Sequence, residues 1–198
     1  MSYELFAAFV VFAVVTLFTP GPNNVMLMAS GLNFGFRRTL PHVAGVDLGF
    51  GFMVLVVGIG LGAIFTAVPM LYTVLKFVAA AYLLYLAWKI ATAGTIHEDA
   101  GTRPFTFLQA AAFQWVNPKG WIMAIGAVAT YAAVAAFPFN TILMVVVFIV
   151  FGLASSLTWL LFGTGLRTIV ANPRSVRVFN FAMAGLLVAS LIPVFLEG

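Results

Sequence analysis

The stretch Thr-Pro-Gly-Pro-Asn-Asn at residues 19–24 lies inside a segment that is otherwise apolar enough to cross a membrane. Two prolines and a glycine stop an α-helix, because proline lacks the backbone N–H and clashes with the preceding turn. Lipid offers the freed backbone groups no partners, so such a break must be buried in protein or line a water-filled cavity. A second break, Asn-Pro-Lys-Gly at 117–120, lies in a similar apolar setting. Paired breaks in the two halves of a membrane protein indicate a transporter's binding site.

The composition around these breaks is that of a membrane protein. Hydrophobic residues make up 64% of the 198 residues and charged residues 7%, which leaves too much apolar surface for one soluble core. A spanning helix needs about 20 mostly apolar residues. Six segments meet this need, at 4–32, 40–66, 70–92, 106–136, 140–165 and 177–196. We therefore predict an all-α membrane protein with six transmembrane helices, of which the first and the fourth are broken.

Several classes of protein are excluded by what the sequence lacks. There is no cysteine, which excludes disulfides, thiolate metal sites and dithiol chemistry. There is no Gly-rich phosphate loop and no soluble domain, so neither an ATPase nor a cofactor is expected. No basic region precedes the first apolar run, so we expect this segment to stay as a helix and not to be a cleaved signal peptide.

The net charge of +4 indicates orientation in a membrane and not nucleic-acid binding, because the basic residues flank the ends of the apolar segments. Seven of the nine lysines and arginines flank the connections after the first, third and fifth segments: Arg37, Arg38, Lys89, Arg103, Arg167, Arg174 and Arg177. The connections on the other side, 67–69 and 137–139, contain no lysine or arginine. By the positive-inside rule the basic connections are cytoplasmic, so both termini are predicted to lie outside. A three-helix repeat then reverses its orientation, and residues 1–93 and 105–198 are predicted to be two inverted repeats of one transporter domain.

The first break supplies a predicted binding region for the substrate. Its residues are Pro20, Gly21, Pro22, Asn23 and Asn24. Asn23 or Asn24 is predicted to cap a half-helix that restarts at Val25. A helix N-terminus inside the bilayer presents N–H groups and a partial positive charge, which suit a carboxylate. The alternative is a proline kink that only shapes the helix bundle.

The second break adds Asn117, Pro118 and Lys119 to the predicted substrate-binding residues. Asn117 is predicted to cap the renewed helix, and Pro118 suits the first helical position. A lysine buried near mid-membrane costs at least about 2.5 to 3.5 kcal/mol, so we expect a counter-charge, an anionic substrate group or water beside Lys119. The alternative is a lysine whose side chain reaches the cytoplasmic surface. Gln114, one turn earlier, is predicted to hydrogen-bond to another helix.

Asp47 is the only carboxylate well inside a predicted span, and it is the candidate for ion coupling. It can carry a proton or pair with a substrate ammonium, or it can be a structural partner of Lys119 or Lys76. His42 lies five residues earlier, which is not the same helical face. We therefore predict a surface histidine at position 42 and no relay between His42 and Asp47.

Taken together, these residues resemble the LysE/RhtB family of bacterial amino-acid exporters. The resemblance runs almost from end to end, through Thr-Pro-Gly-Pro-Asn-Asn at 19–24, Gly-Phe-Arg at 35–37, Ala-Gly-Val-Asp-Leu-Gly at 44–49, Ala-Ala-Tyr-Leu-Leu-Tyr-Leu-Ala-Trp-Lys at 80–89 and Val-Asn-Pro-Lys at 116–119. It implies six spans and secondary active export of amino acids or their derivatives by proton antiport. In an inner-membrane exporter, the termini that the positive-inside rule places outside are periplasmic. The stretches 76–92 and 113–117 are most similar to the branch that exports cysteine and O-acetylserine.

The leading hypothesis is an exporter that binds a small zwitterion between the two repeats and exchanges it for protons. An intramembrane enzyme is one alternative, and it needs Asp47, His42 and Lys119 within hydrogen-bond reach of one another. A passive channel or a metal-ion exporter is another, and metal transport needs several carboxylates, histidines or thiols around one cavity. Lipid-facing and dimer-forming helices have the same composition, so the sequence leaves a homodimer open.

Overall fold

The computed structural model describes residues 2–61, 67, 69–92, 103–169, 172–192 and 195. Over these residues the chain is helical and has no β-strand, so the predicted all-α class is confirmed. The elements are α1 (Tyr3–Phe18), α2 (Pro22–Phe34), α3 (Phe36–Val56), η1 (Val57–Leu61), α5 (Pro69–Ala91), α6 (Phe107–Phe113), η2 (Gln114–Val116), α7 (Pro118–Tyr131), η3 (Ala132–Val134), α8 (Phe139–Ile169) and α9 (Pro173–Ala189). The predicted connection at 93–104 lies outside the described residues up to position 102.

Three parts of the described chain are long and apolar enough to cross a membrane, if a bent pair is taken as one of them. Two are single helices, at Phe36–Gly60 and Phe139–Arg167. The third is the pair α1 and α2, whose axes differ by 49° at the first break. Length and composition thus identify up to three spans among the described residues, whereas the sequence predicts six. The six spans in two inverted repeats stay a prediction.

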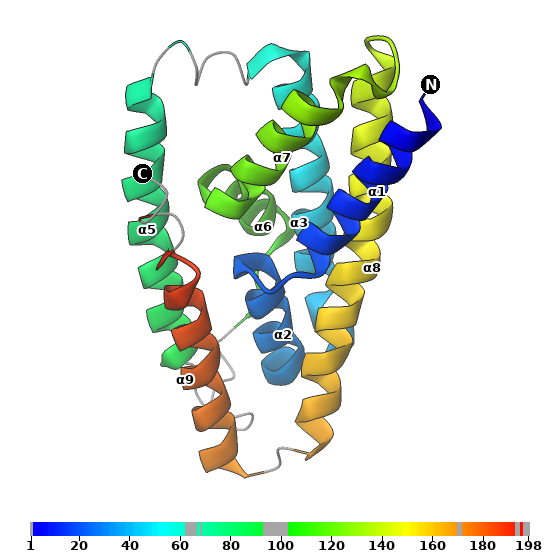
Figure 1. Ribbon diagram of the computed structural model, residues 1–198. Coiled ribbons are helices and arrows are strands. Elements are labelled where there is room, and N and C mark those ends of the chain that lie inside the picture. Colours follow the sequence, from blue (N-terminus) through cyan, green and yellow to red (C-terminus); the bar gives the residue numbers. More distant parts are fainter. Residues whose placement is uncertain are drawn as a thin grey trace.

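The long helix α8 is the element against which α1, α2 and α3 pack, as Figure 1 shows. Glycine permits the closest of these approaches. A methyl group at Gly31 of α2 would lie 2.5 Å from the carbonyl oxygen of Leu160 on α8, and one at Gly163 would meet the backbone of Met28. Small residues at such crossings let two helix backbones touch, and they hold α2 at a fixed depth along α8.

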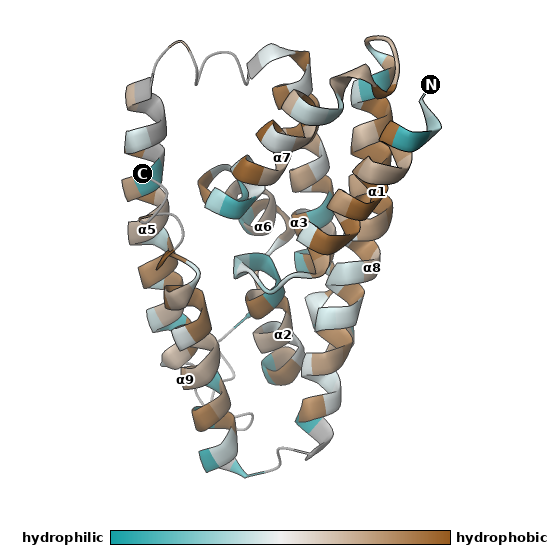
Figure 2. Ribbon diagram, viewed as in Figure 1, coloured by the Kyte–Doolittle hydropathy of each residue, from teal (hydrophilic) through white to brown (hydrophobic). Residues whose placement is uncertain are grey.

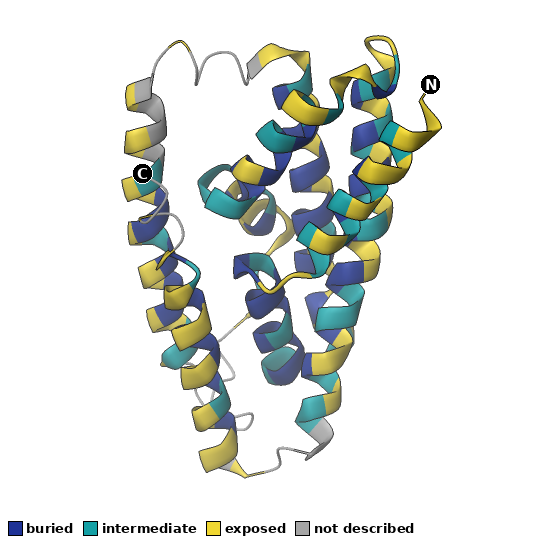
Figure 3. Cartoon of the chain, viewed as in Figure 1, coloured by how far each residue is buried: buried dark blue, intermediate teal, exposed yellow. Residues whose placement is uncertain are grey.

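Helices α5 and α9 form a second pair on the other side of α2 (Figure 1). Their facing sides bury Ala80, Leu83, Leu187 and Leu191 against α2 and the region of η2. Their outer sides are exposed (Figure 3) and largely hydrophobic (Figure 2). Apolar residues on an outer face suit a bilayer, in which the surrounding lipid is as apolar as the side chains.

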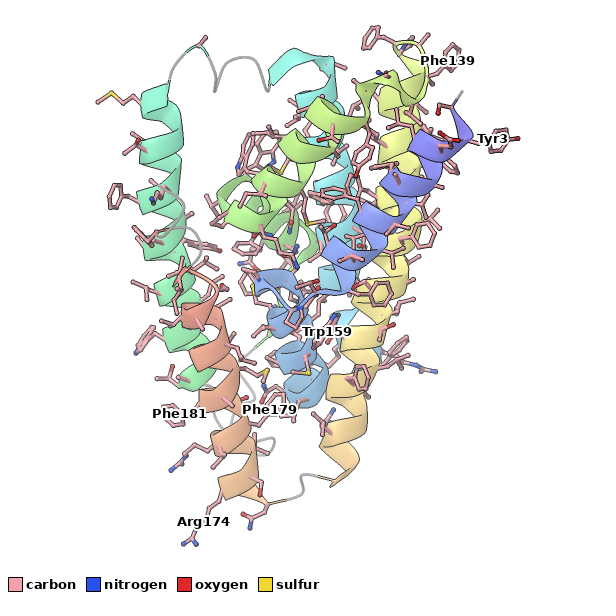
Figure 4. The ribbon with its side chains drawn as sticks, in the orientation of Figure 1. Tyr3, Phe139, Trp159, Arg174, Phe179 and Phe181 are labelled. Carbon is pink, nitrogen blue, oxygen red and sulfur yellow. The ribbon has the colours of Figure 1, made fainter. Side chains whose placement is uncertain are left out.

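The two ends of the helix bundle differ in charge. Tyr3 and Phe139 lie at one end and Arg174 at the other (Figure 4). Helices α2, α5 and α8 end, and α3 and α9 begin, at the end that holds Arg174 (Figure 1). The turn from α2 to α3 is made by Gly35, whose φ of 79° favours glycine, and the Arg167 guanidinium lies next to it. The basic residues that follow these helices therefore collect at one end.

Candidate functional site

The first break separates α1 from α2 by the three residues Thr19 to Gly21. The prediction that the helix restarts at Val25 is wrong, because α2 begins at Pro22. Proline is suited to the first helical position, where its missing N–H would have no intrahelical partner. Gly21 precedes it with an extended backbone (φ −163°, ψ 179°) and makes no side-chain cap.

Asn24 stabilises the end of α1, and the predicted capping of α2 by Asn23 or Asn24 is wrong. The Nδ2 of Asn24 donates to the carbonyl oxygens of Leu17 at 3.0 Å and Thr19 at 2.9 Å. Carbonyls in the last turn of a helix have no intrahelical partner, and an amide nitrogen can satisfy two of them. Asn24 therefore folds back across the break and holds the two half-helices together.

Asn23 joins the first break to the second through a reciprocal amide pair. Asn23 Nδ2 donates to Gln114 Oε1 at 2.9 Å, and Gln114 Nε2 donates to Asn23 Oδ1 at 3.1 Å. Gln114 Nε2 also donates to the carbonyl of Ala110 at 2.9 Å. The prediction that Gln114 bonds to another helix is confirmed, since Asn23 lies on α2 and Gln114 on η2.

The second break is an extended residue between two helical pieces. Asn117 has φ −90° and ψ 107°, and α7 begins at Pro118. Asn117 occupies the N-cap position, but its side chain makes no capping bond, and its buried Oδ1 has no hydrogen-bond partner. The predicted cap is therefore absent. A carbonyl beside the break, that of Trp115, instead accepts from Trp121 Nε1 at 2.9 Å.

Lys119 reaches from the second break to the first. Its Nζ donates a hydrogen bond to the carbonyl oxygen of Thr19, and its aliphatic stem packs over Gly21. We expected a counter-charge near this ammonium, and the structure supplies the carbonyl end of α1, where the helix dipole is negative. The alternative of a lysine extended to the cytoplasmic surface does not apply, since Lys119 bonds to the break.

Both breaks line one cavity of about 40 Å³, which leaves room for water or for a polar group of a ligand. Five predicted residues line it, namely Gly21, Asn23, Asn24, Asn117 and Lys119. Five further residues do so as well: Thr16, Leu17, Phe50, Gly120 and Met123. Gly120 belongs to the second proline motif, but the sequence gives no sign that Phe50 or Met123 would face this cavity. Pro20, Pro22 and Pro118 do not line it and act through the backbone.

The half-helices α2 and α7 begin in the same way at this cavity. The first bond within α2 runs from the Val25 N–H to the Gly21 carbonyl, and the first within α7 from the Trp121 N–H to the Asn117 carbonyl. In each half-helix the backbone N–H groups that precede this first bond have no partner within the helix, and they carry partial positive charge. With the Lys119 ammonium, they make the cavity suitable for an anionic group.

Asp47 lies outside this cavity, in the contact between α3 and α8. Its Oδ1 accepts from Ser156 Oγ at 3.1 Å, and its buried Oδ2 has no hydrogen-bond partner. Lys119 bonds to Thr19, and Lys76 lies over the Phe195 ring at 4.9 Å. The predicted structural pairing of Asp47 with either lysine is therefore wrong for the described residues.

The serine pair on α8 connects Asp47 to the first break. Ser155, which precedes Ser156, donates from Oγ to the carbonyl of Leu17 at 2.8 Å, and the same carbonyl accepts from Asn24. Polar contacts thus run from the carboxylate through α8 to the end of α1. Our sequence analysis missed the two serines, although adjacent hydroxyls inside an apolar run were a visible signal.

His42 is buried, so the predicted surface histidine is wrong. Its Nδ1 lies 3.1 Å from Ser30 Oγ on α2, and its ring stacks on Phe105 with 5.3 Å between centroids. Its Nε2 has no hydrogen-bond partner. His42 packs against the part of α2 that precedes the turn at Gly35, and this contact buries the imidazole ring.

The three side chains required by the enzyme alternative are not brought together. His42 contacts Ser30, Asp47 contacts Ser156 and Lys119 contacts Thr19. No hydrogen bond joins any two of the three among the described residues. In the same part of the chain no group of three or more His, Cys, Asp or Glu side chains is placed to hold a metal ion.

Comparisons with known proteins identify the family of the chain. The model of the LysE type translocator matches residues 14–195. The chain is 34% identical over 132 residues to the cysteine/O-acetylserine efflux protein of Escherichia coli O1:K1 / APEC, an alignment that covers 66% of this chain and 67% of that protein. It is 35% identical over the same length to the protein of that name from Salmonella choleraesuis (strain SC-B67).

No solved structure gives a significant match to the chain. The family match covers both breaks and the cavity between them, and the relatives carry the name of efflux proteins and not of enzymes. This chain is therefore a membrane transporter that belongs to the LysE type translocator family.

Proposed function

We propose that this protein is a secondary active exporter of small zwitterionic amino acids or amino-acid derivatives across the bacterial inner membrane. The observation that carries this proposal is the cavity shared by two proline-initiated half-helices and the Lys119 ammonium. The names of the similar efflux proteins make cysteine and O-acetylserine the first substrates to test.

The Lys119–Thr19 hydrogen bond suggests how a zwitterion is held. The Lys119 ammonium donates a hydrogen bond to the carbonyl of Thr19. A bound substrate brings both charges, so its ammonium replaces Lys119 at this carbonyl while its carboxylate accepts from Lys119 and from the N–H groups at the start of α2 and α7. Lys119 thus exchanges the Thr19 carbonyl for the substrate carboxylate, and every charged group keeps a partner.

Asp47 is proposed to carry the coupled proton. It is a buried carboxyl group whose Oδ2 lacks a partner, and Ser156 and Ser155 link it to the carbonyl end of α1. Ionisable groups inside membrane segments commonly serve as proton carriers. A change in its charge would alter the contact between α3 and α8, and hence the position of the first break relative to α8.

The proposed architecture is six spans in two inverted repeats, 1–93 and 105–198, with cytoplasmic basic connections and periplasmic termini. The similar starts of α2 and α7 at one cavity support two related repeats, and the gathering of basic residues at the Arg174 end (Figure 4) supports this orientation. Rocking of one repeat against the other would open the cavity to each side in turn.

Flux measurements in vesicles test this function. The purified protein is reconstituted, and vesicles with the Arg174 end outward and an acidic lumen receive labelled O-acetylserine, cysteine and a panel of other amino acids. We expect saturable accumulation that stops when an ionophore collapses the pH gradient. No flux of any amino acid would overturn the proposal. Saturable flux that does not depend on the pH gradient would reject proton antiport. Non-saturable flux down the concentration gradient of the amino acid would favour a passive channel.

A further inference from the structure

A second and larger cavity, of about 620 Å³, lies between α2, α5 and the residues that lead into α6. Residues in the last turns of α2 and α5, among them Asn33, Phe34 and Lys89, line it. Both helices end at the end of the molecule where the basic residues gather (Figure 1). The volume of the cavity is within the range of about 300 to 1,000 Å³ that is typical of small-molecule sites. It is distinct from the cavity at the breaks, since the two share no lining residue.

The lining of this second cavity favours an anionic ligand. Lys89 and Arg103 contribute two cations, and the described residues around the cavity include no carboxylate. The Nζ of Lys89 lies 5.7 Å from the centre of the Tyr85 ring, which holds the ammonium at the cavity wall. Two cations in a concave wall raise the local concentration of anions and speed their arrival.

One face of α2 leads from this second cavity to the breaks. Asn23, Met26, Ser30 and Asn33 follow one another at three- and four-residue spacing, so they share a side of the helix. Asn23 lines the cavity at the breaks, and the other three line the second cavity.

The Asn23–Gln114 amide pair connects a residue that lines the cavity at the breaks, Asn23, to a residue five positions after Gln109 of the second cavity. Gln114 is fully buried and is held by the carbonyl of Ala110, the residue that follows Gln109 in the wall of the second cavity. The reciprocal bonds of 2.9 and 3.1 Å close the space between α2 and η2. A ligand moving along this face of α2 has to separate the pair.

We infer that the second cavity is a vestibule that first binds the substrate carboxylate at Arg103 and Lys89, and that the Asn23–Gln114 pair is the gate between the vestibule and the breaks. This inference rests on the proposed function for the nature of the ligand. It assigns a role to Lys89 and Arg103 apart from orientation in the membrane, and it places a binding step before the central site.

The absence of cysteine allows a binding test that does not depend on transport. Ile90→Cys places one thiol in the vestibule wall, and Gln109→Cys is a second position should the first variant fold poorly. A membrane-impermeant thiol reagent is applied from the basic end, with O-acetylserine or its methyl ester as the protecting probe. We expect protection by O-acetylserine and not by the ester, which lacks the carboxylate.

Charge-neutral variants then locate the carboxylate site. In Arg103→Gln or Lys89→Gln, the O-acetylserine concentration that gives half protection should rise by about fivefold. Arg174→Gln removes an exposed arginine of the same end, outside the vestibule, and should leave this concentration unchanged. Equal protection in all three variants, or no protection in the parent, would overturn the vestibule. If O-acetylserine but not its ester protects the thiol and no flux is found, the proposed export would be overturned and the vestibule would stand.

The gate is tested by a thiol on the far side of the amide pair. Met123→Cys lies in the cavity at the breaks. Its labelling from the basic end should accelerate by about tenfold in Gln114→Met, which keeps the length of the side chain and removes its three hydrogen bonds, two to Asn23 and one to the Ala110 carbonyl. Asn23→Leu should do the same, and Asn140→Leu, whose side chain bonds to the Ala132 carbonyl and lines neither cavity, should not. Unchanged labelling in both pair variants would overturn the gate.

Discussion

The Nζ of Lys119 donates a hydrogen bond to the carbonyl oxygen of Thr19, which lies 100 residues earlier in the chain. The lysine lies in the first turn of α7, where the positive end of a helix dipole disfavours a cation, and it reaches the negative end of α1, where a cation is stabilised. This contact joins the two breaks directly. It also explains how an ammonium group is tolerated in an apolar bundle without a carboxylate beside it.

Replacement of Lys119 tests the proposed carboxylate partner. Lys119→Met keeps the aliphatic stem and removes the charge, so we expect kcat/KM for O-acetylserine flux to fall by at least about tenfold, because hydrogen bonds to charged groups are worth about 1.5 to 3 kcal/mol. Lys76→Met is the matched control, since Lys76 lies over Phe195 on another helix pair. A flux equal to wild type in Lys119→Met would reject the role of this lysine.

Gly21→Ala tests the packing of the lysine stem. The extended backbone at Gly21 accepts alanine, but the new methyl group would lie 2.7 Å from Cδ and 3.0 Å from Nζ of Lys119. We expect the lysine to be displaced from Thr19 and flux to fall, while the free energy of unfolding changes by less than about 2 kcal/mol, since a flexible side chain can move aside.

The matched control for Gly21→Ala is a glycine with space around it. Gly126→Ala would place its methyl group 3.8 Å from the Phe12 ring, an ordinary contact. We expect normal flux and a gain of about 0.5 to 1 kcal/mol, because alanine is favoured over glycine inside a helix. Both variants are compared by vesicle flux and by thermal unfolding in detergent. Normal flux in Gly21→Ala would contradict the close packing with Lys119.

Asn24→Ala tests the link across the first break. It leaves the carbonyls of Leu17 and Thr19 without their amide donor, so we expect the free energy of unfolding to fall by about 1 to 3 kcal/mol. Thr158→Ala, which removes a bond from an exposed hydroxyl to its own helix, should change it by less than about 0.5 kcal/mol. Thermal unfolding in detergent measures both, and equal shifts would show that Asn24 does not hold the break.

Asp47→Asn tests the coupling role. The amide oxygen can still accept from Ser156, so the fold should persist, but the side chain can no longer gain or lose a proton. We expect exchange of labelled for unlabelled substrate to continue and gradient-driven accumulation to stop. Ser156→Ala keeps the carboxyl group and should still accumulate substrate. Normal gradient-driven accumulation of substrate by Asp47→Asn would show that another group carries the coupled proton.

The sequence alone determined the helical class, the positions of both breaks and membership in a transporter family. These features are local or compositional. Pro22 and Pro118 each occupy the first position of a new helix, where the missing N–H of proline has no intrahelical partner to lose. The high apolar content excludes a single soluble core. The family resemblance likewise rests on motifs that stand in the chain itself, and the match over residues 14–195 confirms it.

Only the tertiary structure decided which groups satisfy the broken backbone. Asn23 or Asn24 was expected to cap the half-helix after the first break, and Asn24 instead reaches back to α1. His42 was expected at the surface, and α2 covers it. A side chain near a break can bond to either half-helix or to a distant segment, and the nearest unpaired carbonyl or amide is fixed by how helices pack and not by spacing along the chain. That is why the Lys119–Thr19 and Asn23–Gln114 contacts, on which the proposed site depends, could not be predicted from the sequence.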